Sequence, residues 1–590
     1  MKARALFAAP SIGSITASSG DLQILRSADP LDNHLDTIVH SFVDGCRNHP
    51  DRALLQVPVG LSWRCYTWFE IGRMVDEVAQ RLLDEGVAGS VIMLSGPSLS
   101  HLVLSLAAQS VGLPVVPISP AYSLKASSPH RLQAMVSMVQ PEVVFAESAE
   151  FLPAVRALAA RINLSADTVD GMTALSAFTT PATIAVDEAR QRVHGGTVAK
   201  IMFTSGSTGM PKGVVNTHSM LAANQQQLRQ IWPFIAHEPP VLLDWLPWSH
   251  TFGGNHNLNL VLTNGGTYWL DDGTPDRIDR TVANLNMARP NVYFNVPLGY
   301  SRLIERLERE PSAARVFFSS ARMACCAAAA MEQSVWHRLL TLVKSFDSPT
   351  VLTSSWGLTE TSPACTSAHF ESDNPRNIGV PLPGVEVALR KSGDGIGKAE
   401  LWVRGPNVAT RYLTIDGERS AVDDQGWLRT GDAATLVEAG NPSGGLSFDG
   451  RLAEDFKLSS GTFVNAAVVR SRLLEAGAGV IRHVVLCGQD TDSVSAIIWL
   501  EPDCPPSDVI RSKLSGILAT VAIGAGSSQR VARVVVATTP PDLGSGEITD
   551  KGYVNGARVR AQRQELVELV LRGEAPQVIH APWAVGPGDG

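Results

Sequence analysis

Residues 201–214 read IleMetPheThrSerGlySerThrGlyMetProLysGlyVal and are the most informative segment of the chain. We expect an apolar strand that ends at Thr204 and a following loop with three hydroxyl side chains, two glycines and Lys212. Glycines let backbone N–H groups close around phosphate oxygens, while hydroxyls and a lysine add donors and positive charge. A polar surface turn has a similar composition and is the alternative. The predicted phosphate-binding residues are Thr204, Ser205, Gly206, Ser207, Thr208, Gly209 and Lys212.

The loop is not a Walker A sequence. Counted from Gly206, that motif needs a second glycine at position 211 and a serine or threonine at position 213. Pro211 and Gly213 occupy those positions, which argues against P-loop nucleoside triphosphatase chemistry.

The bulk composition describes a globular protein of more than one domain. Of the 590 residues, 44% are hydrophobic and 18% are charged, and single cores stop growing at roughly 250–300 residues. A net charge of −8 without a long basic run argues against a nucleic-acid partner. The seven cysteines include no CxxC pair, which argues against zinc ribbons and redox dithiols and favours a reducing compartment.

The most apolar region, residues 91–118, contains three prolines, two glycines and a histidine. It cannot supply the roughly 20 apolar residues of a membrane span. It fits better as a strand, a helix and a second strand, the βαβ unit of an α/β protein. The apolar stretch at the N-terminus breaks at Pro10 and Gly13, too early for a signal peptide. We therefore expect a cytoplasmic protein without a membrane span.

The pattern of strands and helices changes along the chain. Apolar strands alternate with helical stretches to about residue 380, which predicts layered α/β structure. Short strands separated by glycine-rich turns then predict a β subdomain over residues 384–450. We expect an N-terminal domain at 1–450, a hinge at 451–454, a small α+β domain at 455–573 and a loose tail at 574–590.

The string ThrSerGlySerThrGly-x-ProLysGly closely resembles the phosphate-binding signature of the adenylate-forming superfamily, which includes acyl-CoA synthetases, adenylation domains and luciferases. SerTrpGlyLeuThrGluThr, residues 355–361, is similar to a second element of that superfamily. By this resemblance Trp356 and Gly357 line the nucleotide pocket, Thr359 contacts the α-phosphate and Glu360 binds Mg²⁺. A carboxylate suits this hard cation, which typically combines one or two carboxylates with phosphate oxygens.

Further elements follow in the order that the superfamily requires. GlyTrpLeuArgThrGlyAsp at 426–432 and AspGlyArg at 449–451 imply that Asp432 and Arg451 bind the ribose. LeuProTrpSerHis at 246–250 implies an acyl pocket bordered by His250, Gly254 and Asn255. A metal site of His250 and His256 is disfavoured, because their spacing is not i, i+4 and no cysteine accompanies them.

Three departures from the superfamily pattern concern the adenine pocket, the hinge and the catalytic lysine. The Gly-Ala-Ala element is Ala328-Ala329-Ala330 here, which places Ala329 at the nucleotide and loses the easy positive φ of glycine. The hinge position two residues after Arg451 is Ala453. Where many relatives have Ser-Gly-Lys, this chain has Ser545-Gly546-Glu547, so the resemblance assigns the catalytic lysine to Lys551.

The resemblance implies an enzyme that uses ATP and Mg²⁺ to convert a small carboxylic acid into an acyl-adenylate and then transfers the acyl group to coenzyme A. The expected catalytic residues are Thr204, Glu360 and Lys551, and a loop at Gly461 would line the CoA tunnel. The segments at 118–124, 244–257, 453–464 and 546–555 are most similar to feruloyl-CoA synthase. This resemblance implies a hydroxycinnamic acid as the substrate. An enzyme that loads a carrier protein and a degenerate nucleotide-binding protein are the alternatives.

Overall fold

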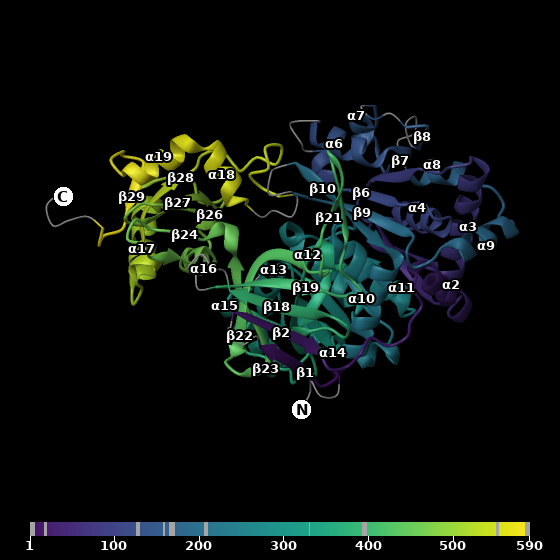
Figure 1. Cartoon of the computed structure of the whole chain (residues 1–590), viewed down its shortest axis with the longest axis horizontal. Coiled ribbons are helices and arrows are strands. Elements are labelled where there is room, and N and C mark those ends of the chain that lie inside the picture. Colours follow the sequence, from purple (N-terminus) through teal and green to yellow (C-terminus); the bar gives the residue numbers. More distant parts are fainter. Residues whose placement is uncertain are drawn as a thin grey trace.

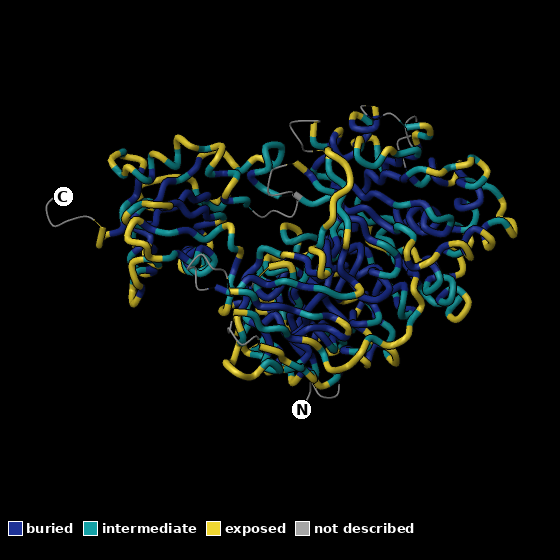
Figure 2. Tube along the Cα trace, in the orientation of Figure 1, coloured by how far each residue is buried: buried dark blue, intermediate teal, exposed yellow. Residues whose placement is uncertain are grey.

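The computed structural model describes residues 6–16, 21–124, 130–156, 158, 160–164, 171–205, 210–329, 331–391, 398–549 and 554–584. Figure 1 shows a large domain that holds the N-terminus and a smaller domain, in yellow-green and yellow, that holds the C-terminal part. Figure 2 shows that each has its own buried interior. This is the two-domain arrangement that the sequence predicts.

The predicted βαβ unit lies in a mainly parallel sheet of the large domain. Strands β5 and β6 run parallel on either side of a crossover helix, α4 (Leu99–Ser110), whose residues are all buried. In the described residues this sheet has eight strands, in the order β21 (Gly417–Ser420), β20 (Arg411–Thr414), β10 (Pro211–Thr217), β9 (Val198–Ser205), β6 (Val115–Ile118), β5 (Ser90–Leu94), β7 (Pro141–Ala146) and β8 (Ile162–Leu164).

A second long sheet contains most strands of the segment predicted as a β subdomain. The sheet continues beyond residues 384–450, because β23 pairs with β17, which precedes the segment, through Asn377 and Ser447. The N-terminal strand β2 also joins β18, a pairing that no local pattern predicts. Within the described residues the order is β1 (Ile12–Thr16), β2 (Leu22–Ser27), β18 (Glu386–Lys391), β19 (Ala399–Arg404), β22 (Leu428–Glu438), β23 (Asn441–Arg451), β17 (Asn377–Pro381), β16 (Ala364–Ser367), β15 (Val351–Gly357), β14 (Met323–Cys326) and β13 (Val292–Asn295).

Helices pack on these sheets, and local sequence explains where several begin. Thr67 and Glu70 form a capping box at the start of α3, and Thr217 caps α10. The remaining strands of the large domain are β11 (Val241–Asp244), β12 (Thr267–Leu270), β3 (Ala53–Val59) and β4 (Ser62–Thr67). Its helices include α2 (Ile38–Asn48), α3 (Trp68–Asp84), α5 (Pro120–Leu124), α6 (His130–Val139), α7 (Leu152–Arg156), α8 (Gly171–Ala177), α9 (Ile184–Arg192), α10 (His218–Ile231), α11 (Leu258–Thr263), α12 (Ile278–Ala288), α13 (Pro297–Arg309), α14 (Pro311–Ser320) and α15 (Gln333–Ser345).

The small domain combines helices and strands, as the sequence predicts. Part of the predicted loose tail, β29, pairs antiparallel with β28, because Val578 and Ile579 bury their apolar side chains there. Its elements are β24 (Phe456–Lys457), β25 (Phe463–Val464), α16 (Ala466–Ala476), β26 (Ile481–Cys487), β27 (Val494–Leu500), α17 (Asp508–Ala522), β28 (Val531–Val536), α18 (Gly556–Gln562), α19 (Gln564–Arg572) and β29 (Val578–His580).

The domains are joined at the end of β23, where a short 3-10 turn, η6 (Leu452–Glu454), follows Arg451. Lys398 of the large domain pairs with the buried Asp455 directly after this turn. All seven cysteines are free thiols. None of the helices that the structure describes is long and apolar enough to cross a membrane.

Candidate active site

The predicted phosphate loop connects the two strands of a β-hairpin. Strands β9 and β10 pair antiparallel, with Thr204 opposite Lys212 and Ser205 opposite Pro211. The hydroxyl of Thr204 is buried and has no hydrogen-bond partner within the described part of the chain, as expected of a donor reserved for a ligand. Gly206, Ser207, Thr208 and Gly209 lie outside the described residues.

Glu360 and Lys212 meet at the end of this hairpin. Glu360 lies in a 3-10 turn, η5 (Thr359–Thr361), and its Oε1 is 2.9 Å from the Lys212 Nζ. The Tyr412 hydroxyl of β20 donates to the same oxygen at 3.0 Å, and the Lys212 Nζ lies 3.9 Å from the centre of the Tyr412 ring. Burial opposes ionisation of Glu360, but the Lys212 ammonium and the Tyr412 hydrogen bond outweigh it and lower its pKa. Glu360 is therefore a carboxylate at neutral pH.

The arrangement around Glu360 fits a magnesium ion that is shared with phosphates. Both side-chain contacts use Oε1, which leaves Oε2 as the oxygen for a cation. Among the described residues, no three His, Cys, Asp or Glu side chains gather into a metal cage. A cation at Glu360 would therefore take its other ligands from phosphate oxygens and water, which is the usual coordination of Mg²⁺.

The two predicted ribose residues are cross-strand neighbours. Asp432 of β22 lies opposite Arg451 of β23, with Arg451 Nε 3.4 Å from Asp432 Oδ1. The Trp356 indole donates to Asp432 Oδ2 at 2.9 Å. Burial raises the pKa of Asp432, and Arg451 and Trp356 oppose that rise. Asp432 Oδ1 is buried and accepts no hydrogen bond from the described residues, so it can receive a hydroxyl.

Backbone constraints shape the predicted adenine side. A Cβ on Gly357 would lie 1.7 Å from the Pro363 carbonyl oxygen, so only glycine fits there. Ala328 has φ +72°, in the left-handed region. Ala328 thus holds a φ that glycine adopts without strain, and the alanine bears a cost of about 1 kcal/mol. Ala329 follows it and is exposed.

Residues 42–413 match the model of the AMP-binding enzyme family. The chain belongs to this family. A long-chain-fatty-acid–CoA ligase of Yersinia pestis is 30% identical over 249 residues, which are 41% of this chain and 42% of the relative. A mitochondrial malonate–CoA ligase of Mus musculus is 28% identical over 317 residues, which are 49% of this chain and 52% of the relative. The chain thus spans about half the length of these curated relatives.

The fold comparison confirms the predicted fold class of this AMP-binding enzyme. The crystal structure of an anthranilate CoA ligase in complex with anthranoyl-AMP superposes with a TM-score of 0.67 and covers 91% of this chain and 98% of that chain. The sequence identity is 18%, so this likeness concerns the fold alone.

The predicted acyl-pocket residues lie on a π-helical turn, η3 (Phe252–Asn257), or just before it. A Cβ on Gly254 would lie 2.2 Å from the Trp248 carbonyl oxygen, which explains the glycine. Asn255 is fully buried and donates to Asn216 Oδ1 at 3.2 Å, so its amide ties η3 to β10. His250 precedes the turn and accepts the Gly254 N–H at its carbonyl oxygen at 2.8 Å.

Sequence reasoning missed two residues of this AMP-binding enzyme. Tyr412 contacts Glu360 from a β-hairpin that belongs to no quoted motif, so no local signal marks it. Lys200 is buried in β9 and donates to the Gly254 carbonyl at 2.7 Å, and burial lowers its pKa to about 7. π-helical turns are common at functional sites and disturb the regular ladder of backbone hydrogen bonds. The sequence did offer a signal for Lys200, because a lysine is unusual within the apolar strand before the phosphate loop.

The small domain contributes less to the described site. Lys551 lies outside the described residues. The segment that contains it is flanked by a β-bridge between Ile548 and Val554. Gly461 lies in an exposed turn between β24 and β25 with φ +78°, and a Cβ there would meet nothing within 4 Å. The roles of both residues stay predictions.

Proposed function

We propose that this AMP-binding enzyme is an ATP-dependent carboxylic acid–CoA ligase that releases AMP and pyrophosphate. The observation that supports this most is the cluster of Lys212, Glu360 and Tyr412 beside the unpartnered Thr204 hydroxyl. Cation, carboxylate and hydroxyl converge where a nucleotide triphosphate chain would lie. Asp432, whose Oδ1 lies 3.4 Å from Arg451 Nε but accepts no hydrogen bond from the described residues, would supply a ribose contact.

In the first half-reaction, the carboxylate oxygen of the acid attacks the α-phosphorus and the bond to pyrophosphate breaks. Lys212 and the Thr204 hydroxyl would stabilise the negative charge that develops on the phosphates. Mg²⁺ held by Glu360 would neutralise further charge on the leaving group. We assign Lys551 to the same task. In the second half-reaction, the CoA thiol attacks the acyl carbonyl, and AMP leaves with the electron pair of the broken C–O bond.

We propose a hydroxycinnamic acid such as ferulate as the substrate. The amino-acid sequence around the motifs supports this substrate. So does a cluster of aromatic rings at η3, in which the rings of His256 and Phe294 lie 4.8 Å apart and those of Phe252 and Phe294 lie 6.1 Å apart. Aromatic edge-to-face contacts of this kind suit an aromatic acid. The curated relatives are named for long-chain fatty acids and malonate, so those acids form the competing set.

The test is pyrophosphate release with ferulate, coumarate, benzoate, malonate and palmitate, each with and without CoA. We expect release with the hydroxycinnamates that is sustained only when CoA is present. Sustained release with palmitate or malonate instead would replace the proposed substrate but keep the ligase. Release that CoA does not sustain would indicate a carrier-loading enzyme, and no release with any acid would contradict the proposed function. A Glu360→Gln variant assayed in parallel controls for contaminating activity.

A further inference from the structure

The loop before the predicted catalytic lysine contacts the large domain. Arg131, at the start of α6, donates from Nη2 to the Ser545 carbonyl oxygen at 3.2 Å, although the two residues are 414 positions apart. Helix α6 packs against β10 and β20, the strands that carry Lys212 and Tyr412. Figure 1 shows the small domain reaching toward α6 at this point. The contact therefore joins the small domain to a helix that packs on β10 of the phosphate hairpin, which is formed by β9 and β10.

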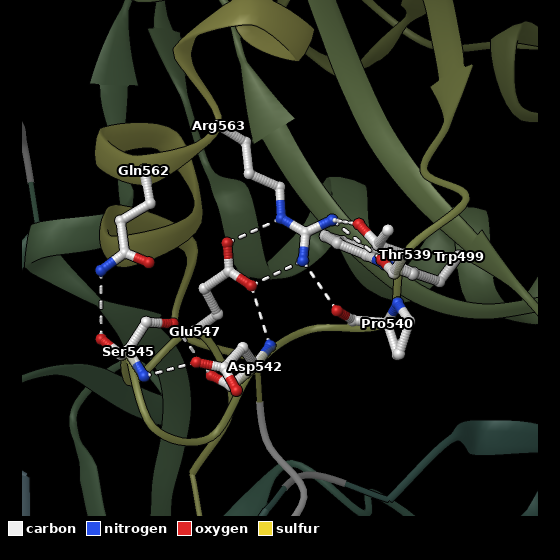
Figure 3. A network of polar contacts seen from close by, with 8 residues as sticks. All are labelled: Trp499, Thr539, Pro540, Asp542, Ser545, Glu547, Gln562 and Arg563. Carbon is white, nitrogen blue, oxygen red and sulfur yellow. Dashed lines mark hydrogen bonds and ion pairs between the residues drawn. The ribbon is translucent and has the colours of Figure 1, made fainter. Parts of the chain in front are cut away.

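The loop is held in one shape by a buried ion pair, shown in Figure 3. Arg563 donates from Nε to Glu547 Oε1 and from Nη2 to Oε2, both at 2.6 Å, and the Asp542 N–H donates to Oε2 at 2.8 Å. The Ser545 N–H in turn donates to Asp542 Oδ2 at 2.6 Å. Arg563 and Glu547 side chains are only 12% and 4% exposed. The Ser545 carbonyl is thus presented by a rigid loop.

Gly546 makes the approach of Arg131 possible. Its φ is +82°, and a Cβ at this position would lie 2.4 Å from Arg131 Nη2. A side chain would therefore be strained and would also push the guanidinium away. Arg131 further lies close enough to Asp542 to favour its charged form: burial opposes ionisation there, and the Ser545 N–H and Arg131 help to lower the pKa.

The same loop fixes both sides of the segment that contains Lys551. Ile548 pairs with Val554, and the Asn555 N–H donates to the Glu547 carbonyl oxygen at 2.7 Å. A contact that fixes residues 542–548 therefore also fixes Ile548 and Val554, the two residues between which the Lys551 segment runs.

We propose that Arg131 is a positioning residue for adenylation: by holding the Ser545 carbonyl, it docks the loop that leads to Lys551 against the phosphate hairpin. The inference rests on the proposed function. The contact spans two domains, so a rotation of the small domain about the hinge at residues 451–454 breaks it. Arg131 therefore serves the first half-reaction and is dispensable for the second.

The test measures the half-reactions separately in the full-length chain. Acyl-adenylate formation is followed from ATP and acid, and thioester formation from supplied acyl-adenylate and CoA. Arg131→Ala should slow adenylation about tenfold or more, since a hydrogen bond from a charged donor is lost, with little change in the KM for ATP. Thioester formation should stay within about twofold, and Arg131→Lys should restore part of the adenylation rate.

Two further variants keep the result decisive. Arg156→Ala removes an exposed arginine from nearby α7 and should change neither half-reaction. Gly546→Ala disturbs the same contact from the small domain and should also slow adenylation without slowing thioester formation. This variant keeps the test valid if Arg131→Ala has a lowered melting temperature. If the wild type is active but Arg131→Ala loses the same activity in both half-reactions, or in neither, the role of Arg131 is overturned and the proposed function stands. A wild type that forms no acyl-adenylate overturns the proposed function and this inference together.

Discussion

Glu360 and Glu547 are two buried carboxylates, each paired with a cation, in the two domains of the molecule. Lys212 and Tyr412 both approach Oε1 of Glu360, whereas Arg563 holds both oxygens of Glu547 and the Asp542 N–H adds a third bond. A carboxylate with both oxygens engaged by its own protein has little capacity left for a ligand. The difference separates a carboxylate that is prepared for a cation from one that fixes a loop.

The strongest test of this distinction is Glu360→Gln. The amide keeps the shape but cannot hold a cation with a negative charge, so adenylation should fall about 10²–10³-fold. Pyrophosphate exchange measured over a range of Mg²⁺ concentrations reports the loss. The melting temperature should change little, because Lys212 is partly exposed and can be solvated. A large drop in melting temperature would show that Glu360, too, is mainly structural.

Glu547→Gln should show the opposite balance, with a larger effect on stability than on the adenylation chemistry. Removing one charge of a buried pair leaves Arg563 uncompensated, at a cost of about 3 kcal/mol. The cost should appear as faster hydrogen exchange in peptides from residues 531–572, with peptides around Glu360 unchanged. Arg563→Lys is the matched variant and should lose the two-point contact while keeping the charge. Unchanged hydrogen exchange in both variants would contradict a structural role for the Glu547–Arg563 pair.

Much of the candidate site could be predicted because its residues lie within contiguous motifs that resemble those of the adenylate-forming superfamily. Lys212, Glu360, Asp432 and Arg451 were all predicted in this way, and the structure brings them together in two pairs. Tyr412 was not predicted, because it meets Glu360 only through the pairing of β20 with β10. Glu547 was noted only as a missing lysine, since its bond to Arg563 depends on how the loop folds back onto the residue before α19.

The fold shows the same division. Apolar runs separated by turns predicted β5, α4 and β6, whose contacts lie close in sequence. The pairing of β2 with β18 joins residues more than 350 positions apart, and no local periodicity encodes a partner at that distance. The unpredicted strand β29 is likewise an edge strand of three residues, too short to show a period of its own.

Tyr412→Phe sharpens the comparison by removing one of the two contacts on Glu360 Oε1. A hydrogen bond to a charged acceptor contributes about 1.5–3 kcal/mol, so adenylation should fall about tenfold or more and require more Mg²⁺ for half-saturation. The cation–π contact with Lys212 is kept, because phenylalanine retains the ring. An unchanged rate at limiting Mg²⁺ would mean that Tyr412 does not orient the carboxylate.

The pH dependence of adenylation should follow Glu360 on its acid side. Its pKa in the folded protein is lowered from 4.5, with Lys212 and Tyr412 outweighing burial. A lowered pKa means that the interaction is fully present above pH 4.5 and is lost as pH falls through the folded value. The rate should therefore stay independent of Glu360 titration down to about pH 5. Tyr412→Phe should move the acid limb upward, and a limb that does not move would point to a different group.

The smallest expected effect compares two left-handed residues, one in each domain. Gly546 adopts φ +82° without strain, whereas Ala328 bears a methyl at φ +72°. Ala328→Gly should therefore raise the free energy of unfolding by about 1 kcal/mol, less the entropy that glycine adds to the unfolded chain. Ala329→Gly is the matched control: its φ is not positive, so only the entropic cost remains and that variant should be slightly less stable. Opposite shifts in urea midpoint would establish strain at Ala328, and equal shifts would exclude it. Where this strain also holds the backbone away from the nucleotide, only Ala328→Gly should lower the KM for ATP. Removing the Cβ of residue 328 both relieves the strain and lets the backbone approach the base more closely.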